Sequence, residues 1–93
     1  MPLVGSGMIG PGAAEYFDGV LRGGHHYSVY VRPSEPGVEF DLYVYDERGN
    51  VVGVDADTSP DAYCPLNPAW TGPFRLEVRS HRGLSDYQIL VQE

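Results

Sequence analysis

Hydrophobic and polar residues alternate along four segments of this chain: "HYSVYVR" (26–32), "FDLYVYD" (40–46), "FRLEVRS" (74–80) and "DYQILVQ" (86–92). A period of two over five to seven residues is typical of a β-strand that buries one face. The segments "AAEYFDGV", "NVVGVDA" and, more weakly, "AYCPL" predict further strands. The alternation predicts a core made of Tyr27, Val29, Val31, Phe40, Leu42, Val44, Phe74, Leu76, Val78, Tyr87, Ile89 and Val91.

Clusters of Gly, Pro and Asp separate these segments, as expected for turns between short strands. In "DERGN", Asp46 begins a predicted turn, Glu47 is expected at its exposed tip, and Gly49 supplies the positive φ that the turn needs. No window has a helical period with caps. The pattern therefore predicts an all-β fold, a single antiparallel β-sandwich.

The first residues, "MPLVGSGMIGPGA", are rich in glycine and differ from the rest of the chain. We divide the sequence into a Gly-rich N-terminal arm, residues 1–13, and a sandwich domain, residues 14–93. The arm is expected to be flexible, or to add a strand to the sandwich or to a neighbouring molecule. It has neither the basic region nor the long apolar run of a signal peptide.

The charge balance narrows the choice of partners. Thirteen Asp and Glu residues against six Arg give a net charge of −7. That charge argues against nucleic acid and against an anionic membrane surface, and no apolar run is long enough to span a bilayer.

Residues with catalytic potential do not assemble into a known motif. "GSGMIG" matches G-x-G-x-x-G but lacks the strand before it and the helix after it that a dinucleotide site needs. His25 and His26 are adjacent on a strand, so their side chains point to opposite faces. Cys64, the single cysteine, lies in an apolar run and is expected to be buried and slow to react. We predict that the chain is not an enzyme.

Seven carboxylates lie between Glu39 and Asp61. Most are expected to be turn and outer-face residues, since Asp and Ser form turns with their own backbone. If a metal binds, the spacing favours calcium, held by Asp55 and Asp57 with Asp61 or Asp41 completing an oxygen shell.

Tyrosines occupy the polar positions of two predicted strands. Alternation places Tyr30, Tyr43 and Tyr45 on outer faces, opposite the apolar side of each strand. Exposed tyrosines on a sheet offer a large contact area at low entropic cost, so these three predict a surface that binds protein or polysaccharide. The alternative is that they pack under a loop or under the N-terminal arm.

The segments "FDGVLRGGHHYSVYV", "VEFDLYVYDERGNVVGVD", "TGPFRLEVRS" and "SDYQILVQ" resemble the bacterial pre-peptidase C-terminal domain. The resemblance covers about residues 16–91 and implies a jelly-roll-like β-sandwich that serves exported enzymes as an accessory or binding module. It therefore implies an extracellular or cell-surface location. The similar collagen-binding domains carry calcium at an acid-rich linker, whereas the corresponding segment of this chain has a single acid, Glu15.

Two hypotheses of function follow. The first is a non-catalytic binding or accessory module, stabilised by calcium if the acidic loop holds the ion. The second is a self-assembling structural protein, such as a filament or surface-layer subunit, in which the N-terminal arm completes a neighbour's sheet.

Overall fold

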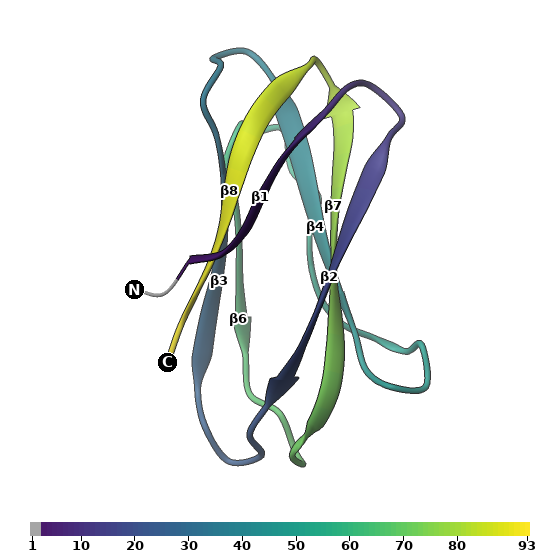
Figure 1. Ribbon diagram of the computed structural model, residues 1–93, viewed down its shortest axis with the longest axis vertical. Coiled ribbons are helices and arrows are strands. Elements are labelled where there is room, and N and C mark those ends of the chain that lie inside the picture. Colours follow the sequence, from purple (N-terminus) through teal and green to yellow (C-terminus); the bar gives the residue numbers. More distant parts are fainter. Residues whose placement is uncertain (1–2) are drawn as a thin grey trace.

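The computed structural model describes residues 3–93, and it describes side chains from residue 5 onward. Eight strands form two sheets packed face to face (Figure 1). The strands are β1 (Leu3–Ile9), β2 (Ala14–Leu21), β3 (Tyr27–Pro33), β4 (Glu39–Tyr45), β5 (Val51–Asp55), β6 (Ala62–Leu66), β7 (Gly72–Arg82) and β8 (Ser85–Gln92). No helix occurs within these residues, so none there could cross a membrane.

The order of the strands is that of a jelly roll. One sheet has the order β1-β8-β3-β6 and the other β2-β7-β4-β5, and every pair is antiparallel. The first strand thus pairs with the last, the second with the seventh, the third with the sixth and the fourth with the fifth, like a long hairpin rolled up. The predicted fold class, a single antiparallel β-sandwich of the jelly-roll type, is confirmed.

Side chains from the inner faces of both sheets fill the core. Every residue predicted to lie in the core is buried except Val91, which is partly buried and packs against the others. Ile9, Val38, Ala62, Cys64 and Leu66 complete the cluster. The alternation in β3 and β6 explains why the prediction succeeded, because each inward position meets the opposite sheet.

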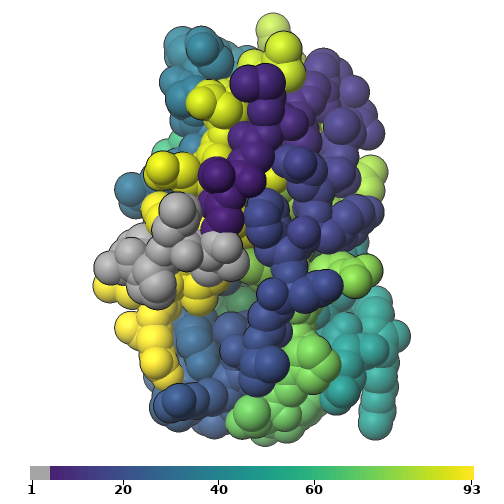
Figure 2. Space-filling model, viewed as in Figure 1, coloured from purple at the N-terminus to yellow at the C-terminus, as the bar shows by residue number. Residues whose placement is uncertain are grey.

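Residues 3–9 of the predicted arm form the edge strand β1, which corresponds to the alternative in which the arm adds a strand to the sandwich. Register pairs run from Leu3 with Leu90 to Ile9 with Ser85. In Figure 2 the purple atoms of β1 lie between the yellow atoms of β8 and the blue atoms of β2. The predicted boundary at residue 13 therefore does not divide an arm from the sandwich, because residues 3–9 belong to one of its sheets.

The glycines of β1 have a packing role. A Cβ on Gly5 would lie 2.3 Å from the Phe17 ring, and one on Gly7 would lie 2.8 Å from the Tyr87 hydroxyl. Only glycine allows the strand to pass this close to the aromatic side chains beneath it. The pairing of β1 with its own chain also occupies the segment that the self-assembly hypothesis required. Self-assembly itself stays a prediction.

The turn between β4 and β5 forms as predicted. The Asp46 carboxylate accepts hydrogen bonds from the amides of Arg48 (2.8 Å) and Asn50 (2.9 Å), and from the Asn50 side chain (3.0 Å). The bond from the Asn50 side chain is the main reason that the pKa of Asp46 lies below its usual range. Glu47 is exposed and Gly49 has a φ of 82°. Asp46 is thus a turn residue that uses both carboxylate oxygens locally.

Candidate functional site

Three tyrosines surround a carboxylate on the outer side of the β2-β7-β4-β5 sheet. Glu77 of β7 is in register with Tyr16 of β2 on one side and with Tyr43 of β4 on the other. Tyr45 lies two residues along β4 from Tyr43, and strand alternation therefore places it on the same face. We call this surface, made by Tyr16, Tyr43, Tyr45 and Glu77, the tyrosine face.

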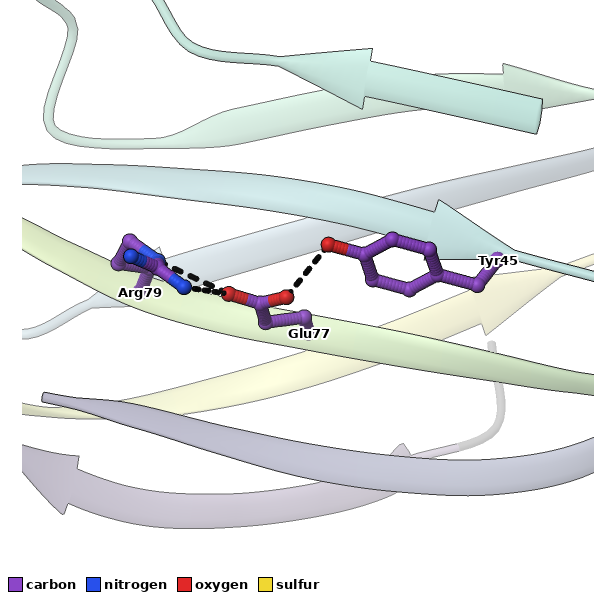
Figure 3. Close-up of polar contacts among 3 residues, drawn as sticks. All are labelled: Tyr45, Glu77 and Arg79. Carbon is purple, nitrogen blue, oxygen red and sulfur yellow. Dashed lines mark hydrogen bonds and ion pairs between the residues drawn. The ribbon is translucent and has the colours of Figure 1, made fainter. Parts of the chain in front are cut away.

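Glu77 is the centre of a hydrogen-bonded network on that face (Figure 3). It points away from the core but is only 3% exposed. The Tyr45 hydroxyl donates to Glu77 Oε1 at 2.6 Å, and the Arg79 guanidinium donates to Oε2 at 2.8 Å from Nε and 2.6 Å from Nη2. These bonds compensate the carboxylate for the water that it has lost.

The network changes the acid–base behaviour of its members. The hydrogen bond to Glu77, more than burial, raises the pKa of Tyr45 to about 12. The same carboxylate raises the pKa of Arg79 through the hydrogen bond between them. Tyr45 and Arg79 therefore keep their protons across the physiological range, so the network orders the side chains and does not relay protons.

A second ion pair orders the neighbouring row of residues. Arg75 donates to Asp18 at 2.8 Å from Nε and 3.2 Å from Nη2. This hydrogen bond lowers the pKa of Asp18. The Arg75 guanidinium also lies 5.6 Å from the centroid of the Tyr16 ring, a cation–π arrangement. Tyr16 is 54% exposed, so its ring is held in place while much of it still faces solvent.

The structure separates the three tyrosines predicted to form one binding surface. Tyr43 and Tyr45 lie on the tyrosine face, whereas Tyr30 belongs to β3 and points outward from the opposite sheet. The prediction of a single surface is therefore corrected. Sequence reasoning missed Tyr16 and Glu77, because their approach to Tyr43 depends on the pairing of three strands that are distant in the chain.

The four predicted calcium ligands are not brought together. Asp55 is in register with the inward-facing Leu42, and its Oδ2 accepts from the Tyr63 amide of the other sheet at 2.7 Å. Asp41 precedes Leu42 and therefore points to the opposite face of the same sheet. Asp57 closes its own turn by accepting from the Ser59 amide at 2.8 Å, and Asp61 is exposed.

This arrangement does not fit a calcium site. Within residues 3–93 no three His, Cys, Asp or Glu side chains converge as metal ligands. Burial, reinforced by the charges of Asp55 and Glu39, raises the pKa of Asp41, while His81 acts in the opposite direction.

Cys64 is buried as predicted, at 3% exposure. Burial is the main cause of its raised pKa, and the charge of Asp55 adds to it. The thiol packs in the core between the sheets, so it behaves as a small apolar residue.

Comparison with known proteins identifies the fold. No protein-family model matches the sequence, and no curated protein does. The structure of the pre-peptidase C-terminal domain of collagenase from Bacillus anthracis superposes with a TM-score of 0.73 at 14% identity, covering 97% of this chain and 90% of that one. This match confirms the fold that the sequence resemblance implied, and at that identity it shows the fold alone.

A second solved structure shares less. The N-terminal modules of an endo-1,4-beta-D-xylanase from Clostridium thermocellum, complexed with xylohexaose, match with a TM-score of 0.45 at 18% identity. That match covers 78% of this chain and 17% of the other. A TM-score of this size does not establish a common fold.

Proposed function

We propose that this chain is a non-catalytic binding module and that its tyrosine face contacts a partner protein. The observation that carries the proposal is the ordering of an exposed ring, Tyr16, and a half-buried ring, Tyr45, before any partner arrives. Glu77 holds Tyr45 by a hydrogen bond, and Arg75 holds Tyr16 from the side of its ring. A surface ordered in advance loses little conformational entropy on binding.

The composition of the tyrosine face favours protein over polysaccharide as the partner. Tyr and Arg are the residues enriched at the energetic centres of protein interfaces, and both are present here in adjacent rows. The face also carries alternating charge, with Asp18 and Asp41 beside Arg75 and Arg79. Such a pattern selects a surface of complementary charge.

An accessory role outside the cell belongs to the same proposal. The fold is shared with a domain of a collagenase, and this supports a module that works beside an exported enzyme. Collagen is for that reason the first partner to test. We treat it as a probe, since 14% identity carries no ligand from one protein to the other.

The experiment is surface plasmon resonance on immobilised type I collagen, gelatin and fibronectin. The wild-type chain is expected to bind at least one of these proteins. The double variant Tyr16→Ala/Tyr43→Ala should bind it about tenfold or more weakly, because two hot-spot rings are lost. Tyr63→Ala, on the opposite sheet, is the matched control and should bind as the wild type does.

Melting curves of each variant would establish that the chain remains folded. The proposal is contradicted if none of the three proteins binds, or if the double variant binds as tightly as the wild type. Loss of binding in Tyr63→Ala alone would place the protein-binding surface on the other sheet.

A further inference from the structure

A second ordered aromatic surface lies on the outer side of the β1-β8-β3-β6 sheet. Tyr30 of β3 and Tyr63 of β6 are directly opposite in register, and their ring centroids are 5.0 Å apart with the planes inclined by 36°. The Arg32 guanidinium lies 5.2 Å from the centroid of the Tyr30 ring. Tyr63 is 45% exposed. We call Arg32, Tyr30 and Tyr63 the aromatic patch.

None of the three residues of the patch is a carboxylate, and the acid beside it at the start of β6 is the exposed Asp61, which immediately precedes Ala62. Ser28, Leu90 and Gln92 are the outward neighbours on β3 and β8, Pro65 is the neighbour on β6, and Gln88 is in register with Arg32. The next acid along β8, Asp86, is hydrogen-bonded to the Ser34 hydroxyl. Within residues 3–93 no carboxylate forms an ion pair with Arg32.

We propose that the aromatic patch, together with Gln88 and Gln92, binds a neutral polysaccharide. A pyranose ring has a flat face of C–H groups and a rim of hydroxyls. Aromatic rings can cover the C–H face without leaving polar groups unpaired. Side-chain amides and a guanidinium can form hydrogen bonds with the hydroxyls of the rim. Tyr30, Tyr63 and the two glutamines provide both kinds of group on one sheet face.

Charge selects against the other ligands that stack on tyrosine. Nucleic-acid bases stack on aromatic side chains, but their phosphates would be repelled by a net charge of −7. Acidic polysaccharides meet the same repulsion. A partner protein would find one cation in the patch and one exposed acid, Asp61, beside it, fewer charges than surround Glu77 on the other sheet. A neutral, hydroxyl-rich chain meets no such penalty.

This inference does not depend on the proposed function. The aromatic patch and the tyrosine face belong to different sheets and point outward on opposite sides of the sandwich. Each can be lost by substitution without touching the other. The same chain therefore has separate surfaces for a protein and for a polysaccharide.

The test is affinity electrophoresis in native gels that contain hydroxyethylcellulose, galactomannan, arabinoxylan or laminarin, one in each gel. At least one of these neutral polysaccharides should retard the wild-type chain. Tyr63→Ala should migrate as in the polymer-free gel, and Tyr63→Trp, which keeps an aromatic surface, should still be retarded. Tyr16→Ala is the matched control, an exposed tyrosine on the other sheet, and should be retarded like the wild type.

Each remaining outcome contradicts the inference. It fails if no neutral polymer retards the wild type, if only polygalacturonate does, or if Tyr63→Ala is retarded as strongly as the wild type. Should Tyr63→Ala not fold, the exposed pair Gln88→Ala/Gln92→Ala replaces it and must weaken retardation by at least about half. Retardation abolished only in Tyr16→Ala would move the polysaccharide to the tyrosine face.

Discussion

Gly53 of β5 and Cys64 of β6 face each other across the gap between the two sheets. A Cβ built on Gly53 would lie 2.5 Å from Cys64 Sγ and 2.9 Å from a methyl carbon of Leu66. The Asp55 carboxylate, two residues further along β5, accepts from the Tyr63 amide of β6. Together these contacts close one long side of the sandwich, with glycine setting how near the two edge strands approach.

Replacing Gly53 with alanine should therefore destabilise the fold. We expect a loss of about 1–3 kcal/mol in the free energy of unfolding, measured by urea denaturation, because the new methyl overpacks the contact with β6. Gly19→Ala is the control, since Gly19 is also on an edge strand and a Cβ there would meet nothing within 4 Å. That change should stay within about 0.5 kcal/mol of the wild type. Equal losses of stability in Gly53→Ala and Gly19→Ala would contradict the close contact between Gly53 and β6.

The Cys64 thiol should react slowly with Ellman's reagent in native buffer. Burial excludes the reagent and raises the pKa of the thiol, and both effects reduce the reactive thiolate. We expect labelling at least about tenfold slower than in the urea-unfolded chain at the same pH. Equal rates in the two states would show that β6 opens readily.

The hydrogen bond from Tyr45 to Glu77 predicts a loss of stability at alkaline pH. The pKa of Tyr45 is about 12 in the fold against 10.0 ordinarily, so the stabilisation is complete below pH 10 and is lost between pH 10 and about 12. Tyr45→Phe should unfold about 1 kcal/mol more easily at pH 7, and the difference should vanish toward pH 12. Urea unfolding across this range measures it. Tyr30→Phe is the control. A loss of stability of the same size in Tyr30→Phe would show that the effect does not come from the hydrogen bond between Tyr45 and Glu77.

For Asp41 we expect the opposite effect, because replacing this buried carboxylate should stabilise the fold. Its pKa is raised chiefly by burial, so the folded chain holds the proton more tightly than the unfolded chain. Stability from this group is therefore present at low pH and is lost as pH rises through the folded pKa. Asp41→Asn should melt at a higher temperature than the wild type at pH 7, and the difference should shrink as pH falls toward 4. A lower melting temperature at pH 7 would show that the carboxylate is needed in its charged form.

Calcium should leave the melting temperature unchanged. A native-state site filled to about 100 times its Kd would add about 2.7 kcal/mol, a shift of several degrees in a domain of this size. The dispersed positions of Asp41, Asp55, Asp57 and Asp61 give no such site. Thermal melts in millimolar calcium and in chelator should coincide. If calcium raises the melting temperature of the wild type but not that of Asp55→Asn/Asp57→Asn, the predicted ligands do bind calcium.

The strands and the core were predictable because they depend on a local pattern. A residue two positions away along a strand lies on the same face, so the alternation in "HYSVYVR" reports burial directly. β1 was not predictable by that rule. Gly5 and Gly7 take the inward positions there, and their lack of side chains removes the apolar signal just where the packing is tightest.

The candidate surfaces were only half predictable for a different reason. Alternation shows that Tyr30, Tyr43 and Tyr45 point outward, but it cannot show to which of the two sheets each tyrosine belongs. That depends on the roll of the chain, which places β3 and β4 in different sheets although they are consecutive. The burial of Glu77 likewise needs Tyr16, Tyr43 and Tyr45, which reach it from strands on both sides.

The pairing of the first strand with the last also determines how the molecule would bear a mechanical load. Leu3 is in register with Leu90, so β1 begins at the end of the sheet where β8 finishes. A force pulling these two ends apart would act along the hydrogen bonds between the strands and would break them one after another. The sandwich should therefore unzip at low force from β1 inward, instead of resisting in shear across a whole strand.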